Sequence, residues 1–348
     1  MDQPSPTSDL GSGERLSVVL ATYNGSRYLP AQLASLVAQA RLPDEVVIVD
    51  DCSSDDTPTL LREFVATAPF PVDLVLRRER LGTCHTFEEG MRRATGDLLV
   101  ICDQDDRWRE HKLAVFAERM AHRPDALMGF SDARLISSDG RPIGRSRWRV
   151  AGFSPRRARA VASDPFGVLL SHQAVSGCTM AVRSELLPAL FPFPADIHPA
   201  LPVMMYDRWI SLVAAAAAPV VTVPETLVDY RIHPEQQIGI PALRIRRVLP
   251  RTALHGAQLL RGRVESGQRM GYHLAHLAEI EKRLVVAGMA SERSSAVLTA
   301  AEDHLRFRGA LAVARRARLR GVIGELRRED GYRRFSLGLA SAMADLAR

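Results

Sequence analysis

The sequence predicts an α/β protein with a doubly wound, mostly parallel sheet (Rossmann-like) and a C-terminal helical extension. Three observations support this: short apolar runs alternate with helical patterns, polar residues follow the apolar runs, and 46% of the 348 residues are hydrophobic. This length allows about two domains. We expect a disordered lead-in (1–14), a sheet domain (15–240, with halves 15–125 and 126–240) and an Arg-rich helical region (241–348).

Strand, loop and helix units are expected to alternate in the first half. The apolar runs 16–21, 46–49, 72–76 and 98–102 predict buried strands. Apolar residues at helical spacing, or polar helix-starting residues, follow each of them. Because parallel strands need a crossover connection, this alternation favours a parallel sheet covered on both faces. The expected helices span 29–40, 57–66, 83–94 and 108–120.

The pattern is less regular after residue 126. Residues 127–131 and 179–182 are expected to be strands, and the apolar run 210–223 is expected to be a buried helix followed by a strand. Residues 141–159 carry seven arginines with little periodicity, which predicts a long loop over the acceptor side that either grips an anionic acceptor or faces solvent. Five prolines predict that residues 187–202 are rigid and non-helical.

Composition and charge restrict the classes of protein to which this chain could belong. The net charge of +6 is uneven: residues 242–348 carry 21 Lys and Arg against 10 Asp and Glu, and residues 1–241 carry 25 against 30. A nucleic-acid binder is disfavoured because the motif-bearing part is net negative. Four scattered cysteines give no disulfide or zinc pattern. Without an apolar run of membrane-spanning length or a signal peptide, we expect a cytoplasmic protein, either free or peripheral at the inner face of the cell membrane.

An acidic cluster directly follows the fourth expected strand. Side chains at positions i and i+2 of an extended segment point the same way, so Asp103 and Asp105 are expected to converge on one Mg²⁺ or Mn²⁺, with Asp106 turned aside. Such ions are typically held by one or two carboxylates and complete their shell with substrate phosphates. The alternative is an acidic cap of the helix expected from Trp108.

Polar residues end three of the expected strands. Ligands of open α/β sheets bind at the carboxyl ends of the strands, so these residues should face one cleft. No Gly-x-Gly-x-x-Gly or P-loop pattern occurs, which argues against dinucleotide oxidoreductases and P-loop NTPases and makes sugar-nucleotide chemistry a leading class. The three pairs of residues are Thr22/Asn24, Asp50/Asp51 and Asp103/Asp105.

Six segments in order resemble the inverting nucleotide-sugar glycosyltransferases of family 2, which have the GT-A fold. The resemblance covers roughly residues 16–239, and the form of Asp103–Trp108 together with Tyr230–His233 is most similar to the rhamnosyltransferase branch. The chain departs from the family at Arg80, where Asn is usual, and at His85-Thr86. The segments are Val18–Asn24, Val47–Thr57, Gly96–Asp106, Ser176–Cys178, Tyr206–Trp209 and Tyr230–His233.

The resemblance implies a function and a set of site residues. The donor would be a dTDP- or UDP-linked hexose, with rhamnose as the candidate sugar, and the acceptor a saccharide or a lipid-linked glycan in cell-surface polysaccharide synthesis. Asp207 would be the catalytic base, Asp103 and Asp105 would hold Mg²⁺ or Mn²⁺, and Asp50 or Asp51 would fix base and ribose. The nucleotide-sugar residues would be Thr22, Tyr23, Asn24, Asp50, Asp51, Asp103, Gln104, Arg231 and His233, and the acceptor and donor loops would include Gly177, Cys178, Trp108 and Trp209.

Alternative interpretations remain for Asp207, for His233 and for the function of the whole protein. Asp207 is equally placed to begin a helix, and a lone His233 is more often structural. A metal-dependent sugar nucleotidyltransferase would also use paired aspartates, but Ala21–Gly25 is not the glycine-rich basic loop expected of it. A catalytically silent nucleotide- or nucleic-acid-binding protein is the third alternative.

A basic amphipathic helix is expected near the C-terminus. Four apolar residues at helical spacing are interleaved with arginines. Such a helix either lies on an anionic bilayer or packs on the catalytic domain or on a second subunit of a homodimer. The apolar residues are Leu319, Val322, Ile323 and Leu326.

Overall fold

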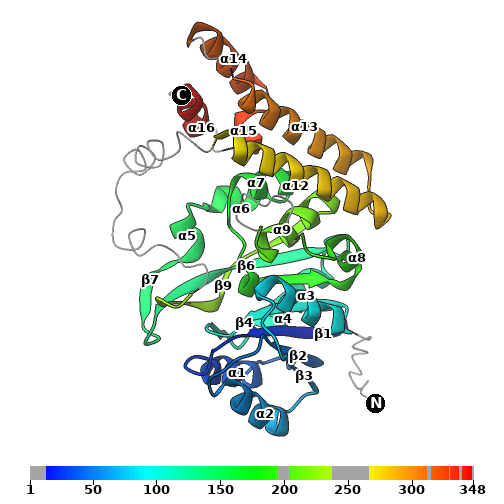
Figure 1. The fold of residues 1–348 in the computed structure, drawn as a ribbon, viewed down its shortest axis with the longest axis vertical. Helices are drawn as coiled ribbons and strands as arrows, with labels where there is room; N and C mark the ends of the chain where they lie inside the picture. Colours follow the sequence, from blue (N-terminus) through cyan, green and yellow to red (C-terminus); the bar gives the residue numbers. More distant parts are fainter. Residues whose placement is uncertain are drawn as a thin grey trace, which may run out of the picture.

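One sheet of nine strands runs through the part of the chain that the computed structural model describes, residues 13–194, 204–236, 266–311, 315–328, 330–336 and 339–346. The strand order is β3-β2-β1-β4-β8-β6-β9-β5, with β7 paired to β6 (Figure 1). This arrangement confirms the predicted α/β class. The proposed lead-in and the boundary at residue 240 lie almost entirely outside the described residues.

The first four strands form the predicted parallel half. Strands β2 and β4 flank β1 in parallel register, and β3 pairs with β2. Alternating residues of β1 point to opposite faces: Val18 joins the apolar cluster of α1, α2 and α4, and Val19 joins that of α3. The bounds are β1 Leu16–Thr22, α1 Leu29–Val37, β2 Glu45–Asp50, α2 Thr57–Thr67, β3 Val72–Leu76, α3 Thr83–Arg93, β4 Leu98–Asp103 and α4 Lys112–Ala121.

The sheet becomes mixed after β4. Strand β8 (Met180–Arg183) is antiparallel to both β4 and β6 (Met128–Ser137), whereas β9 (Val220–Ile232) is parallel to β6. Helix α4 begins four residues later than predicted because β5 (Arg107–Trp108) pairs with β9 and keeps Trp108 extended. A continuous sheet therefore joins the two halves of the predicted domain.

Residues 141–159 do not form the long loop that the sequence predicted. They form strand β7 (Pro142–Ser146) and helices α5 (Arg147–Ala151) and α6 (Pro155–Ala160). Tertiary packing decides this, because Trp148 and Phe153 stack against Phe130 with ring centroids 5.5 and 6.1 Å away.

The proline-rich segment is also partly helical. Leu187–Leu190 forms the short helix α8, whose proline lies in the first turn where no backbone donor is needed. The rest of the excursion, from residue 195, lies outside the described residues.

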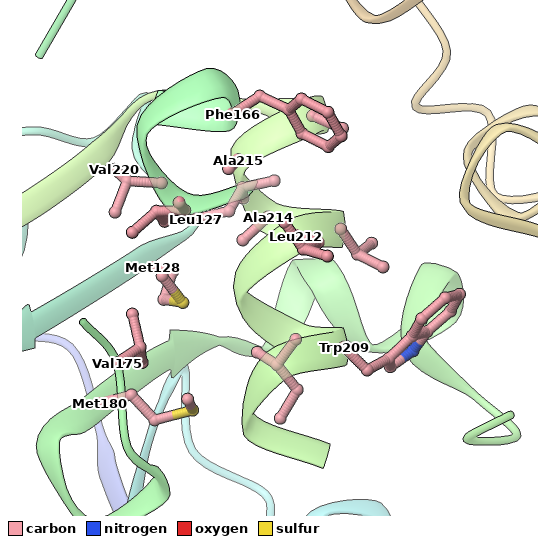
Figure 2. Close-up of a cluster of buried hydrophobic side chains, with 14 of the residues drawn as sticks. Leu127, Met128, Phe166, Val175, Met180, Trp209, Leu212, Ala214, Ala215 and Val220 are labelled. Carbon is pink, nitrogen blue, oxygen red and sulfur yellow. The ribbon is translucent and has the colours of Figure 1, made fainter. Parts of the chain in front are cut away.

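Helix α9 (Tyr206–Ala217) connects the sheet with the C-terminal helices. In Figure 2, Ala214 and Ala215 lie on the side of α9 that faces Met128 and Val220 of the sheet and Phe166 of α7 (Pro165–Ser171), whereas Leu212 points away from the sheet. On its other side α9 contacts α12 (Ser266–Val286) and α13 (Glu292–Gly309), and Leu277, Ile280 and Leu298 belong to the same buried cluster as Trp209. The C-terminal region thus packs on the sheet domain through α12 and α13.

The last helices form a small cluster of their own. Val322 of α14 (Arg315–Arg327) packs with Tyr332 of α15 (Tyr332–Phe335) and Ala342 of α16 (Leu339–Leu346). Of the predicted apolar stripe, Val322 is buried and Leu326 half-buried, whereas Leu319 and Ile323 are exposed. No described helix combines the length and the apolar character needed to cross a bilayer.

Candidate functional site

The carboxyl ends of β1, β2 and β4 meet at one edge of the sheet. The register pairs Thr22 with Asp50 and Ala21 with Asp103. The three polar loops that the sequence placed at strand ends are therefore neighbours in space. This edge holds most of the predicted site residues.

The loop after β1 is fixed by Gln104. The side-chain amide of Gln104 accepts a hydrogen bond from Tyr23 N (2.8 Å) and donates one to Tyr23 O (3.0 Å). A Cβ at Gly25 would overlap Gln104 Oε1, so only glycine permits this approach. Gln104 therefore ties the first strand loop to the acidic loop, and Arg80 covers the ring of Tyr23 at 3.9 Å.

The two aspartates after β2 organise the surrounding backbone. Asp50 accepts hydrogen bonds from Thr22 Oγ1 (2.8 Å) and from both N and Oγ of Ser53 (2.8 and 2.6 Å). Asp51 is satisfied in the same way and is 3% exposed. Both carboxylates thus accept hydrogen bonds from donors within the protein. The sequence interpretation had assigned one of them to contacts with the base and ribose of the nucleotide.

Hydrogen bonding to Asp51 also shapes the next loop. Its carboxylate accepts from Leu81 N and Gly82 N, both at 2.8 Å, and from Arg77 at 2.9 Å. Burial alone would raise the pKa of Asp51, but these donors outweigh it and lower the pKa. Asn24, with φ of 45°, similarly accepts from Ser54 N at 2.8 Å.

The acidic loop does not have the extended form that the sequence predicted. The chain turns at Gln104 and Asp105, so Asp103 and Asp105 do not project in parallel from one strand. Asp105 Oδ2 instead lies 2.8 Å from His233 Nε2. Asp106 is not turned aside but is 1% exposed, and it accepts the backbone N–H of Arg231 at 2.9 Å.

Two groups of side chains offer ligands for a divalent metal. The inner group is Asp103, Asp106 and Cys178, whose ligand atoms lie within 4.8 Å of one another. The outer group is Asp105 with His233, whose side chains meet at 2.8 Å. Carboxylate oxygen and imidazole nitrogen both ligate divalent transition metals.

A buried lysine argues against a metal in the inner group. Lys112 is fully buried, donates from Nζ to Cys178 O at 2.6 Å and lies 3.4 Å from the centre of the Trp108 ring. Burial lowers the pKa of Lys112 to about 8, and the nearby thiols and carboxylates favour its charged form. Because Lys112 brings a positive charge near Asp103 and Asp106, a metal cation at the inner group would be repelled. The residues therefore fit Mg²⁺ or Mn²⁺ better at the outer group.

The end of β9 closes the site from the other side. Arg231 is buried, and its guanidinium donates to Asp105 O (2.8 Å) and Ser138 O (3.1 Å). His233 packs on Tyr28 with ring centroids 4.6 Å apart. Arg231 thus anchors the acidic loop, and its guanidinium is not presented to a diphosphate as the sequence interpretation supposed.

Asp207 lies in the first turn of α9, one residue after its start. Its Oδ1 accepts the N–H of Arg208 at 2.7 Å, and Met205 rather than Asp207 is the N-cap residue. Burial raises the pKa of Asp207, while Arg147 and hydrogen bonds from the backbone of Arg208 and Gly177 oppose the rise. A half-buried carboxylate with few donors is available to accept a proton.

Asp207 and the acidic loop face the same space. Burial raises the pKa of Asp103 to about 7, with further increases from the charges of Asp105 and Asp207. The charges of Asp105 and Asp207 can raise the pKa of Asp103 in this way only if both carboxylates lie close to it. The structure thus brings together three carboxylates from two elements that are about a hundred residues apart in the chain.

Sequence reasoning gave no role to two residues at this site. The hydroxyl of Tyr206 donates to Asp103 Oδ1 at 3.2 Å, and a Cβ at Gly177 would overlap that hydroxyl. Arg147, one of several arginines in its segment, donates to the carbonyls of Gln173 and Ala174 and is the charge that most opposes the raised pKa of Asp207. Tyr206 could have been found from the sequence, because it precedes Asp207 in a matched segment. Nothing in the sequence distinguished Arg147 from the other arginines of residues 141–159.

Two predicted loop residues lie in the core instead. Trp209 is fully buried and donates from Nε1 to Leu190 O at 3.0 Å, and Trp108 is 4% exposed. Both indole rings are buried, so neither lines an open cleft. Gly177 and Cys178, in the short turn Gly177–Thr179, lie beside Tyr206 and Lys112 as just described.

Comparison with known sequences gives a family match for part of the chain. Residues 17–170, less than half of the chain, match the family described as Glycosyl transferase family 2. The sheet with its surrounding helices is an α/β fold.

Individual relatives share part of the chain. An uncharacterized protein of Mycobacterium tuberculosis is 27% identical over 220 residues, 63% of this chain and 59% of that protein. The putative teichuronic acid biosynthesis glycosyltransferase TuaG of Bacillus subtilis is 30% identical over 128 residues, covering 37% of this chain and 50% of TuaG. The succinoglycan biosynthesis protein ExoO of Rhizobium meliloti is 33% identical over 129 residues, covering 37% and 36%.

Solved structures are similar at low sequence identity. TarS 1-349 of S. aureus in complex with UDP has a TM-score of 0.49 and 16% identity, covering 87% of this chain and 82% of that one. The mannosyltransferase PcManGT of Pyrobaculum calidifontis in complex with GDP-Man and Mn²⁺ has a TM-score of 0.48 and 20% identity, covering 99% and 88%.

Proposed function

We propose that this protein is an inverting glycosyltransferase that moves a hexose from a nucleoside-diphosphate sugar to a hydroxyl acceptor. The observation that carries the proposal is the convergence of Asp103, Asp105 and Asp207 at the carboxyl edge of the sheet. The family 2 match over residues 17–170 supports the same class of reaction. Against a nucleotidyltransferase stands Ala21–Gly25, which is not the glycine-rich basic loop expected of that class.

Asp105 and His233 would hold Mg²⁺ or Mn²⁺, with Asp103 in the same loop close to Asp105. When bound, the ion would neutralise charge that develops on the departing diphosphate. The 2.8 Å separation of Asp105 Oδ2 and His233 Nε2 suits two ligands that turn toward one ion. Arg231 and Gln104 keep this loop in place through their backbone contacts.

Asp207 would act as the base. It takes the proton of the acceptor hydroxyl while that oxygen bonds to the anomeric carbon, and the bond from this carbon to the diphosphate oxygen breaks on the opposite face. Attack from the opposite face inverts the anomeric centre. The carboxylate needs to be ionised, which the neighbouring Arg147 and the backbone donors favour.

The donor and acceptor are assigned by resemblance. We propose a dTDP- or UDP-linked hexose, with L-rhamnose as the first candidate, because Asp103–Trp108 and Tyr230–His233 are most similar to the rhamnosyltransferase branch. A saccharide or lipid-linked acceptor in cell-surface polysaccharide assembly fits the names of TuaG and ExoO. The protein would then work in the cytoplasm, where nucleotide sugars are made.

One experiment tests the reaction and the base together. Hydrolysis and transfer are measured over a panel of nucleotide sugars with Mn²⁺, for the wild type and for Asp207→Asn. We expect one donor to be preferred, and the variant to lose transfer while its donor affinity stays within about threefold, because a neutral amide cannot accept the proton. Glu110→Gln, in the loop before α4, is the matched control. Full activity of Asp207→Asn, or no turnover of any nucleotide sugar, would refute the proposal.

A further inference from the structure

Helix α14 presents a mixed apolar and basic face to solvent. Leu319 and Ile323 are 46% and 41% exposed, and Arg327 and Arg320 are exposed beside them. With 3.6 residues per turn, positions 319, 323 and 327 follow one another along one face, and position 320 lies next to it. We call Leu319, Arg320, Ile323 and Arg327 the α14 face.

The orientation of α14 is fixed from its other side. Val322 is fully buried against Tyr332 and Ala342, and Glu325 is 3% exposed and lies 2.8 Å from His304 Nδ1. Rotating the helix to bury Leu319 and Ile323 would expose Val322 and break this buried contact. The α14 face therefore points outward because the opposite face is already committed to packing.

The surroundings of α14 are strongly basic. Residues 306–334 contain ten arginines and three acidic residues, and one of these acids, Glu325, is buried. Met343 on α16, which packs against α14, adds a further side chain that is 58% exposed. In Figure 1, α14 lies at the end of the molecule opposite α2, so nothing in the sheet domain hinders a flat partner there.

We infer that the α14 face docks onto a bilayer that carries anionic headgroups. Aliphatic side chains bordered by arginines suit such an interface, where the alkyl groups enter the acyl boundary and the guanidinium groups meet lipid phosphates. A second copy of the chain would bring the same arginines against one another. Nucleic acid is a poorer fit, because the face has no aromatic side chain on which a base could stack.

Docking of this kind depends on charge and on the two aliphatic residues together. Each arginine near an anionic surface contributes about fivefold to binding, and salt weakens that contribution. The interaction is peripheral and reversible, since a few aliphatic side chains bury little apolar area compared with a spanning helix.

Vesicle co-sedimentation of the full chain tests the inference without a transfer assay. We expect binding to phosphatidylcholine vesicles that contain about 30% phosphatidylglycerol, little binding to phosphatidylcholine alone, and release at high salt. Leu319→Ser with Ile323→Ser, and separately Arg320→Gln with Arg327→Gln, should each weaken binding at least about tenfold.

Matched variants of other exposed residues serve as controls. Val285→Ser with Val286→Ser changes an aliphatic pair on α12 that is 61% and 76% exposed, and Arg62→Gln with Arg293→Gln changes two exposed arginines, on α2 and α13. Both should bind vesicles like the wild type. The inference is overturned if the chain does not bind anionic vesicles, if α14 and control variants behave alike, or if the α14 variants instead dissolve a dimer in solution.

Discussion

Tyr206 Oη donates a hydrogen bond of 3.2 Å to Asp103 Oδ1, which joins the start of α9 to the end of β4. The tyrosine ring packs on Phe87 at 4.2 Å, and its hydroxyl rests against Gly177. Asp207 follows Tyr206 directly in the chain. The side chain of Tyr206 therefore fixes the position of Asp207, the proposed base, relative to Asp103 in the proposed donor site.

Removing this hydroxyl should uncouple the two parts of the site. In Tyr206→Phe the ring keeps its packing, so we expect the unfolding temperature to change by only a few degrees and transfer to fall about tenfold or more, as for a lost bond to a charged group. Steady-state kinetics and thermal unfolding measure the two effects. If the hydroxyl acts through Asp103, Tyr206→Phe will reduce transfer less in the Asp103→Asn background than in the wild type. Additive losses of transfer in the double variant would contradict this role.

The raised pKa of Asp103 should be visible in the stability of the metal-free protein. Burial raises this pKa to about 7 from an unfolded value near 3.9, so the folded chain binds more protons between these values. The free energy of unfolding contributed by Asp103 therefore falls as pH rises from about 4 to about 7.

Comparison with Asp103→Asn isolates this contribution, because other titrating groups are common to both proteins. We expect the variant to gain stability relative to the wild type as pH rises through this window, in thermal unfolding with a chelator present. A difference that stays constant with pH would show that Asp103 is not protonated near neutrality.

Metal binding should depend on the outer group of ligands. His233→Ala and Asp105→Asn should each lower Mn²⁺ affinity in the presence of the nucleotide by about tenfold or more, since each would remove one of few protein ligands. Cys178→Ser should leave the Mn²⁺ affinity within about twofold, because the nearby positive charge of Lys112 opposes a metal ion at the inner group. Calorimetric titration with Mn²⁺ measures the affinity of each variant. A large loss in Cys178→Ser with little change in the two outer-group variants would place the ion in the inner group.

Glycine at position 177 should be required for activity. A Cβ there would overlap Tyr206 Oη and lie 2.6 Å from its ring, so Gly177→Ala must displace the tyrosine from Asp103. We expect transfer to fall at least as far as in Tyr206→Phe. Gly271→Ala in α12, where a Cβ meets nothing within 4 Å, should be neutral or stabilising by about 0.5–1 kcal/mol. Normal kinetics of Gly177→Ala would show that the tyrosine position is not critical.

Local sequence determined the first half of the fold. Apolar runs, breaks and helical spacing define β1 to β4 and the helices between them, because each of these units can be recognised within about ten residues. Polar strand ends also predicted one edge where the loops meet, since parallel strands share the direction of their carboxyl ends.

Tertiary structure decided what the sequence pattern left open. The helices within residues 141–159 depend on Trp148 and Phe153 packing against Phe130, a contact with no local signature. The pairing of Asp105 with His233 and of Asp103 with Tyr206 joins positions more than a hundred residues apart, and the turn at Gln104 sends Asp106 inward toward Lys112. The sequence by itself thus determined which elements form and at which edge polar residues collect. The roles of the individual carboxylates were decided by long-range packing, because burial and neighbouring charges exist only in the folded chain.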